Sequence, residues 1–224
     1  MSPINSRTWS AHIRHLSDMY QMEDPLSCLR RDPPLKSTYK EYVMTKISSF
    51  HERELRDMAY ENSCMTYFNV SLLGLRGRLH PAIKNIHNTN QVINMRPHLK
   101  MLTGDYLTYE KKSHQSGGSP VCRICQLNEN DSYMHILLFC ESLSEPRERI
   151  LTEIITFCQV NNVCIEPYLT DPEKLTQFLL DPASMNLPVR VNINDPILDH
   201  LFKLSRDLCF ALHKLRMKLI HEKT

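Results

Sequence analysis

The chain has 224 residues, of which 42% are hydrophobic and 23% are charged, and its formal net charge is +2. This is a globular composition, long enough to bury a core. The five glycines argue against an all-β fold rich in tight turns, whereas eleven methionines and many leucines favour helices. We therefore predict a mainly α-helical protein.

No apolar run approaches the ~20 residues that a membrane span needs, and the first residues lack the apolar stretch of a signal peptide. We expect an intracellular protein, nuclear or cytoplasmic, with no membrane partner. In such a reducing compartment the eight cysteines are thiols, so a close cluster of them predicts a metal site rather than a disulfide framework.

The first part of the chain is predicted to form helices separated by proline breaks. Apolar residues at helical spacing predict a helix over 7–21, and Asp24-Pro25 is typical of the start of another. A long helix is expected over 37–60. The apolar stretch 64–75 fits either a helix or a strand.

The middle of the chain begins with an expected loop over 79–90. This loop ends in Asn88-Thr89-Asn90, which would cap a helix over 91–103 that Gly104 closes. Residues 113–120 are rich in Gly and Ser and predict a linker.

The last part of the chain is again predicted to be helical. Ser144-Glu145-Pro146 is expected to cap one helix, and Asp171-Pro172 to open a short one. An extended loop is expected over 182–194. Asp195-Pro196 then opens a final helix of about 22 residues, whose apolar stripe is expected to pack on the core of the domain.

Charge is unevenly distributed along the chain. Residues 74–123 hold eight basic residues and two acidic ones, whereas residues 124–199 hold four basic and twelve acidic. The basic block suits contact with a polyanion. Neutralisation by acidic segments that fold back onto the block is an equal alternative.

The strongest motif is a cluster of three cysteines and one histidine. Cys122 and Cys125 are separated by two residues, His135 follows after nine more, and Cys140 after another four. A Cys-x-x-Cys knuckle presents two thiolates to one ion, and a helical turn after Ser132 would return His135 and Cys140 towards it. Three thiolates and one imidazole complete a closed, tetrahedral Zn²⁺ site, so one structural zinc ion is predicted.

A redox pair or a double zinc site fits the cysteines less well. A thioredoxin-like redox pair would lie at a helix start after a strand, without a nearby His and Cys. A RING-type double site needs a second quartet, which Cys158, Cys164 and the dispersed histidines do not supply. The other ten histidines are expected to be surface or core residues. With no phosphate loop, catalytic triad or carboxylate pair visible, we predict a protein that is not an enzyme and has no small-molecule substrate.

The order of these motifs resembles a known family. It runs Arg96-Pro-His-Leu-Lys-Met-Leu-Thr-Gly-Asp-Tyr106, a linker, Cys122-Arg-Ile-Cys125, then Tyr-Met-His135-Ile-Leu-Leu-Phe-Cys140-Glu-Ser-Leu-Ser-Glu-Pro-Arg147. This is similar to the carboxy-terminal region of non-LTR (LINE-type) retrotransposon reverse transcriptase polyproteins, with their zinc-binding segment. The resemblance extends loosely over most of the chain, but only residues 96–147 are specific.

The resemblance implies that Cys122, Cys125, His135 and Cys140 hold zinc and that the region engages RNA or DNA. It also makes an upstream reverse transcriptase domain an expected partner. The paired aspartates of a polymerase palm and an endonuclease domain have no counterpart here. The chain therefore looks like a tail fragment, a degenerate copy or a host-retained derivative.

Together these observations predict three regions: a helical region over 1–112, a zinc-binding region over 113–145, and a helical region over 146–224. In the first hypothesis the protein is a zinc-stabilised accessory domain that binds nucleic acid through phosphate contacts, with tyrosines available to stack on bases. The residues assigned to this role are Arg96, Lys100, Tyr106, Lys111, Lys112 and Arg123, with Tyr109 as a second stacking ring.

The competing hypothesis is a structural or protein-interaction domain whose final helix docks on a partner or on a polymerase core. It predicts an exposed apolar stripe at Leu201, Leu204, Leu208 and Leu215. It also predicts that residues 141–181 neutralise the basic block.

Overall fold

The structure is a computed structural model. It describes residues 9–24, 27, 30–31, 34–61, 65–70, 80–84, 86–184 and 196–222. The chain divides into two compact units, and each is considered by itself. The N-terminal unit comprises residues 1–61 and 71–78, and the C-terminal unit comprises residues 62–70 and 79–224. These units do not coincide with the three regions predicted from the sequence.

The N-terminal unit contains two described helices, α1 (Trp9–Met19) and α3 (Lys36–Glu61), which confirm the helices predicted over 7–21 and 37–60. The ring of Tyr20, just after α1, lies edge-on to Phe50 of α3, with ring centroids 5.2 Å apart. The backbone N–H of Glu23 donates to the hydroxyl of Tyr42 at 3.1 Å. Most of the element predicted after Asp24 lies outside the described residues.

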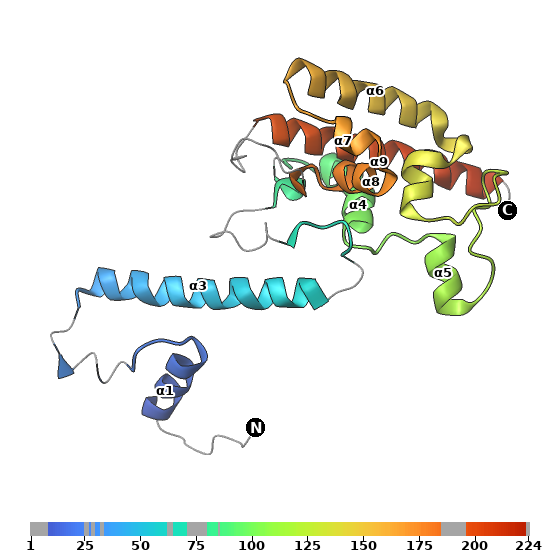
Figure 1. The fold of residues 1–224 in the computed structure, drawn as a ribbon. Coiled ribbons are helices and arrows are strands. Elements are labelled where there is room, and N and C mark those ends of the chain that lie inside the picture. The colour runs from blue at the N-terminus through green and yellow to red at the C-terminus, as the bar shows by residue number, and fades with distance from the viewer. Residues whose placement is uncertain are drawn as a thin grey trace. The chain divides into compact units, whose positions relative to one another are not determined.

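The C-terminal unit is mainly helical in its described part, as Figure 1 shows. Its α-helices are α4 (Thr89–Leu102), α5 (Tyr109–Ser116), α6 (Ser144–Val160), α7 (Glu166–Leu169), α8 (Pro172–Leu180) and α9 (Pro196–Glu222). Short 3₁₀ turns lie at η2 (Pro81–Ile83), η4 (Glu141–Leu143) and η5 (Pro182–Ser184), and η3 (His135–Phe139) is a π-helical turn. The mainly α-helical prediction is confirmed.

Two helix starts in this unit follow the predicted capping chemistry. The side chain of Asn88 accepts a hydrogen bond from the N–H of Gln91 at the start of α4, and Asp171 accepts from Glu173 and Lys174 at the start of α8. The loop expected over 79–90 contains the turn η2. Of the stretch 64–75, residues 65–70 are described and form turns, with the N–H of Phe68 donating to the carbonyl of Met65.

Two local predictions are wrong. The linker expected over 113–120 is helical up to Ser116, because Thr108 caps α5 by accepting from the N–H of Lys111 and Gly117 ends the helix at a φ of 74°. Ser144 is not a cap, since α6 already begins there and continues directly from the 3₁₀ turn η4. Of the loop expected over 182–194, residues 185–194 lie outside the described residues.

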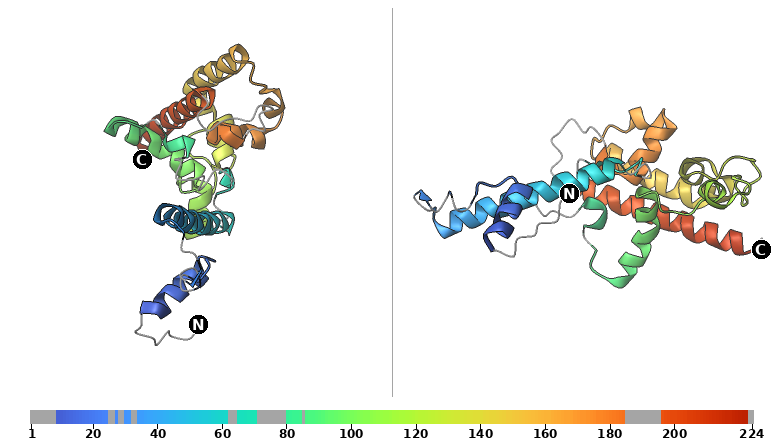
Figure 2. Two further views of the ribbon diagram at one scale, coloured as in Figure 1. Left: turned by 90° about the vertical axis from the view of Figure 1, so that its left-hand side faces the viewer. Right: turned by 90° about the horizontal axis from the view of Figure 1, so that it is seen from below.

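Helix α9 is the centre of the core. It runs beside α6 in the opposite direction and packs against α4, which crosses it steeply (Figures 1 and 2). Leu201, Leu204 and Leu208 are buried in this core, and Leu215 packs against it. The exposed stripe that the competing hypothesis predicted is therefore wrong. Within the described residues, no helix is both long and apolar enough to cross a membrane.

Candidate metal centre and basic cleft

The four predicted ligands converge in the C-terminal unit. The Sγ atoms of Cys122, Cys125 and Cys140 and one ring nitrogen of His135 all lie within 4.8 Å of one another. Cys125 Sγ and His135 Nε2 are 3.3 Å apart. Ligands of a tetrahedral ion with metal–sulfur bonds of ~2.3 Å lie about 3.5–3.8 Å apart, so the four donors are close enough together to hold one such ion.

The knuckle that carries Cys122 and Cys125 is held by a short antiparallel pairing. Val121 bridges Asn130, the N–H of Cys122 donates to the carbonyl of Glu129 at 2.9 Å, and that of Asp131 donates to Pro120 at 2.9 Å. Between these rungs the chain turns back, with Asn128 at a φ of 55°. Both thiols therefore approach from one tight loop.

His135 and Cys140 come from the π-helical turn η3. The N–H of Cys140 donates to the carbonyl of His135 at 2.7 Å, a hydrogen bond that spans five residues. In an α-helix, five residues at about 100° each leave two side chains on different faces. The wider turn returns them to the same side, in keeping with the frequent occurrence of π-turns at functional sites.

The other nitrogen of His135 is held by a carboxylate that was not predicted from the sequence. Glu129 Oε2 lies 2.9 Å from His135 Nδ1, which leaves Nε2 facing the sulfurs. Carboxylates often orient metal-binding histidines in this way. Burial lowers the pKa of His135, but hydrogen bonds to Cys122 and Glu129 outweigh it and raise the pKa above its usual value.

The sulfur environment favours one thiolate. A hydrogen bond from Cys140 lowers the pKa of Cys122 to about 3, and the same contact, together with burial, raises the pKa of Cys140. The thiolate is the form of cysteine that binds metal ions. Cys122, His135 and Cys140 are buried, and Cys125 keeps part of its surface exposed.

A buried ion pair joins the knuckle to α9. Arg216 Nη2 lies 2.6 Å from Asp131 Oδ2, and the same oxygen accepts from the N–H of Tyr109 at 2.6 Å. Both side chains of the pair are almost fully buried. The two residues are 85 positions apart, so the pair could not be predicted from the spacing of neighbouring residues in the sequence.

Several residues predicted to contact nucleic acid line one cleft between α4, α5 and α9. This cleft, called the basic cleft below, has a volume of about 600 Å³ and is lined in part by Arg96, Lys100, Tyr106 and Lys112. Arg96, Lys100 and Lys112 are exposed, and none of them forms an ion pair within the described part of the chain. Arg216 and His213 of α9 also line the cleft, although neither was predicted from the sequence.

Three of the predicted residues, Tyr106, Lys111 and Arg123, are held by contacts within the protein. Tyr106 is only 4% exposed and its hydroxyl lies 3.0 Å from His213 Nδ1, so its ring does not offer a face for stacking on a base. Lys111 Nζ donates to the carbonyl of Gly104. The guanidinium of Arg123 lies 4.8 Å from the centre of the Tyr109 ring.

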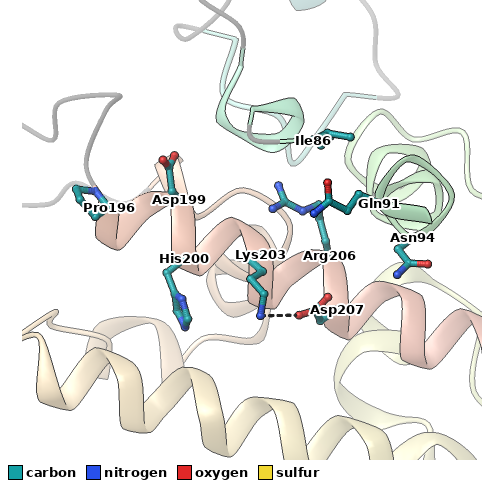
Figure 3. Close-up of a pocket in the computed structure, with 9 residues that line it drawn as sticks. All are labelled: Ile86, Gln91, Asn94, Pro196, Asp199, His200, Lys203, Arg206 and Asp207. Carbon is teal, nitrogen blue, oxygen red and sulfur yellow. Dashed lines mark ion pairs between the residues drawn. The ribbon is translucent and has the colours of Figure 1, made fainter. Parts of the chain in front are cut away.

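A second cleft of about 430 Å³ provides a contrast (Figure 3). It lies between the first turns of α4 and α9 and also contains cations, but these are engaged. Lys203 lies 3.5 Å from Asp207, and Arg206 donates to the carbonyl of Ala82 at 3.2 Å. Nearby, Lys84 of the basic block lies 3.1 Å from Asp199. Among the described residues of the block, Lys84 and Lys111, which lies 3.9 Å from Asp105, are in ion pairs, whereas Arg96, Lys100 and Lys112 are not.

No protein-family model matches this chain, and neither does any curated protein or solved structure.

Proposed function

We propose that this protein is a non-catalytic, zinc-stabilised accessory domain that binds RNA or DNA through the basic cleft. The zinc assignment is supported by the donor set, because three sulfurs and one imidazole are the soft ligands of structural Zn²⁺ sites and are poor ligands for Mg²⁺ or Ca²⁺. Four protein ligands leave no coordination position for a reactive water, so the ion would stabilise the fold and would not take part in catalysis.

The observation that carries nucleic-acid binding is the basic cleft itself. Arg96 and Lys100 lie one turn apart on α4, and Lys112 joins them from α5, so three cations without ion-pair partners in the described chain surround one opening. Binding through such groups is electrostatic and largely independent of sequence. The metal centre supports the cleft because Asp131, beside the knuckle, holds Arg216 of α9 in the wall of the cleft.

The retrotransposon origin is part of the same proposal. Its support is the motif order from Arg96 to Arg147, whose four metal-ligand positions meet in the fold. An upstream reverse transcriptase domain is the partner that this origin implies.

The test is the salt dependence of binding, measured by fluorescence anisotropy with a labelled 20-nucleotide strand and the zinc-loaded protein. We expect affinity to fall steeply between 50 and 200 mM salt, with the slope of log K against log salt reduced by about one for each cation removed in Arg96→Ala and Lys100→Ala. Lys203→Ala, in the second cleft, is the matched control and should leave the slope unchanged. Absence of binding at 50 mM salt, or a flat salt response, would refute the proposal.

A further inference from the structure

The walls of the basic cleft combine cations with apolar side chains. On α4, Ile93, Arg96 and Lys100 follow one another at intervals of three and four residues, so they lie on one face of the helix. On α9, Phe210, His213, Met217 and Ile220 form a similar stripe. Two helical faces therefore line the cleft, each with polar and apolar members.

The apolar part of the cleft is accessible. Ile93 is 47% exposed and Leu107 is 57% exposed, and the ring of Phe210 is only partly buried. These apolar side chains cannot form hydrogen bonds or ion pairs with phosphate groups. A ligand that contacts both the cations and the apolar side chains of the cleft needs a flat apolar group next to its negative charge.

The cleft is lined by the cations Arg96, Lys100, Lys112 and Arg216 and by one carboxylate, that of Asp105. Burial lowers the pKa of His213, and the nearby charges of Arg216 and Lys100 lower it further. Arg216 is almost fully buried, and its Nε has no hydrogen-bond partner among the described residues. Because Arg216 is paired with Asp131, the excess positive charge comes from Arg96, Lys100 and Lys112 of α4 and α5, set against the single carboxylate in the lining.

On the basis of the proposed function, we infer that the basic cleft receives an unpaired nucleotide of a single strand, with its phosphates near Arg96, Lys100 and Lys112 and its base against Ile93, Leu107 and Phe210. A volume of about 600 Å³ lies within the roughly 300–1,000 Å³ of small-molecule sites, which suits one such group. A duplex presents phosphates but keeps its bases stacked inside. The protein should therefore prefer single strands.

The first arm of the test compares three ligands at equal salt: a 20-nucleotide single strand, the duplex of the same sequence, and a strand whose central positions are abasic. Stacking of a base on an aromatic side chain, here the ring of Phe210, is worth about a tenfold gain in affinity or more. We expect the intact single strand to bind about tenfold more tightly than either of the other ligands. Equal affinity for the intact and abasic strands would overturn the inference.

The second arm uses a matched pair of variants on α4. Ile93→Ser removes an exposed apolar wall of the cleft, whereas Val92→Ser changes a neighbouring residue, 39% exposed, that does not line it. We expect Ile93→Ser to weaken single-strand binding about fivefold and to leave duplex binding unchanged. Zinc content and helical circular dichroism verify that both variants are folded.

The outcomes separate the two proposals. Equal weakening by Ile93→Ser and Val92→Ser, or none by either, would overturn the base contact while salt-dependent binding still supports the proposed function. If no strand binds at 50 mM salt, the proposed function fails together with the inference.

Discussion

Helices α3 and α9 have nearly the same length, 26 and 27 residues, but they are buried to very different extents. Ala59 is the buried residue of α3, whereas nine residues of α9 are buried, including Phe202 at 0% exposure. In α9 the apolar residues recur at three and four positions and form one stripe. In α3, Tyr42, Val43 and Met44 are consecutive and therefore point in different directions around the helix.

The same difference extends to the two units. Among the described residues of the N-terminal unit, Ser17 and Ala59 are buried, and Trp9 and Tyr60 are each 72% exposed. The C-terminal unit has a continuous core that includes Cys122 and Cys140 of the metal cluster. Both units therefore form helices. Among the described residues, only the C-terminal unit also has a continuous apolar stripe, a metal cluster and a core.

The largest expected effect is the loss of the metal cluster. Cys125→Ala or His135→Ala should abolish binding of one equivalent of zinc and unfold at least residues 119–142, because ligation contributes on the order of 10 kcal/mol to folding. Metal analysis and a thermal melt check this, with exposed Cys164→Ala as the control. If the Cys125→Ala/His135→Ala double variant retains one equivalent of metal, the ligand assignment is wrong. Helix α3 should keep its hydrogen-exchange pattern in every case.

A second test compares one phenylalanine from each unit. Phe202→Ala should lower the free energy of unfolding of the C-terminal unit by about 3–5 kcal/mol, because it leaves a cavity in the core. Phe50→Ala, at a partly buried site beside Tyr20, should lower that of the N-terminal unit by about 1 kcal/mol. Hydrogen exchange measures each unit separately. Equal losses would remove the distinction between the two units.

A third test concerns the buried ion pair. Arg216→Met should destabilise the C-terminal unit by about 3–5 kcal/mol, since it leaves the Asp131 carboxylate buried without its cation. Lys218→Met, whose partner Glu222 lies 3.7 Å away on the surface, is the control and should change stability by less than about 1 kcal/mol. Chemical denaturation monitored by circular dichroism distinguishes the two. A loss no larger than that of the control would show that the pair is dispensable.

The smallest expected effect is on pH dependence. His98 is buried, and burial lowers its pKa to about 4, although the hydrogen bond that its Nε2 donates to the carbonyl of Leu180, at 2.7 Å, acts in the opposite direction. The folded protein then binds fewer protons than the unfolded chain between pH 4 and 6.5. The contribution of His98, up to about 3 kcal/mol, is therefore complete above pH 6.5 and lost as pH falls towards 4.

Two neighbours modify this profile. Burial also lowers the pKa of His80 to about 4, which adds to the effect, and raises the pKa of Asp181 to about 6, which opposes it between pH 3.8 and 6. His98→Gln retains an N–H donor and should flatten the wild-type slope, whereas exposed His221→Gln should not. Parallel profiles for wild type and His98→Gln would contradict the assignment.

The sequence predicted what local spacing determines. The four metal-ligand positions and most helices followed from intervals of a few residues and from capping side chains such as Asn88 and Asp171. It did not predict Glu129 as the partner of His135. The contact depends on the backbone pairing that brings residues 129–131 beside 120–122, and no side-chain pattern in the sequence indicates that pairing. Tyr106 was assigned to base stacking because basic residues surround it in sequence, but Arg216 and His213 of the distant helix α9 cover it.

The ion pair between Asp131 and Arg216 also determines how the chain can be divided. A peptide of residues 113–145 would include every metal ligand, but it would leave the Asp131 carboxylate without Arg216 and expose Ile136, Leu137 and Leu143 to water. Proteolysis that removes the last turns of α9 would have the same effect from the opposite end of the chain. A fragment that keeps the ion pair must therefore include α9 up to Arg216, and the contacts of Tyr67, Phe68 and Asn69 with the core extend it back to the described residues 65–70.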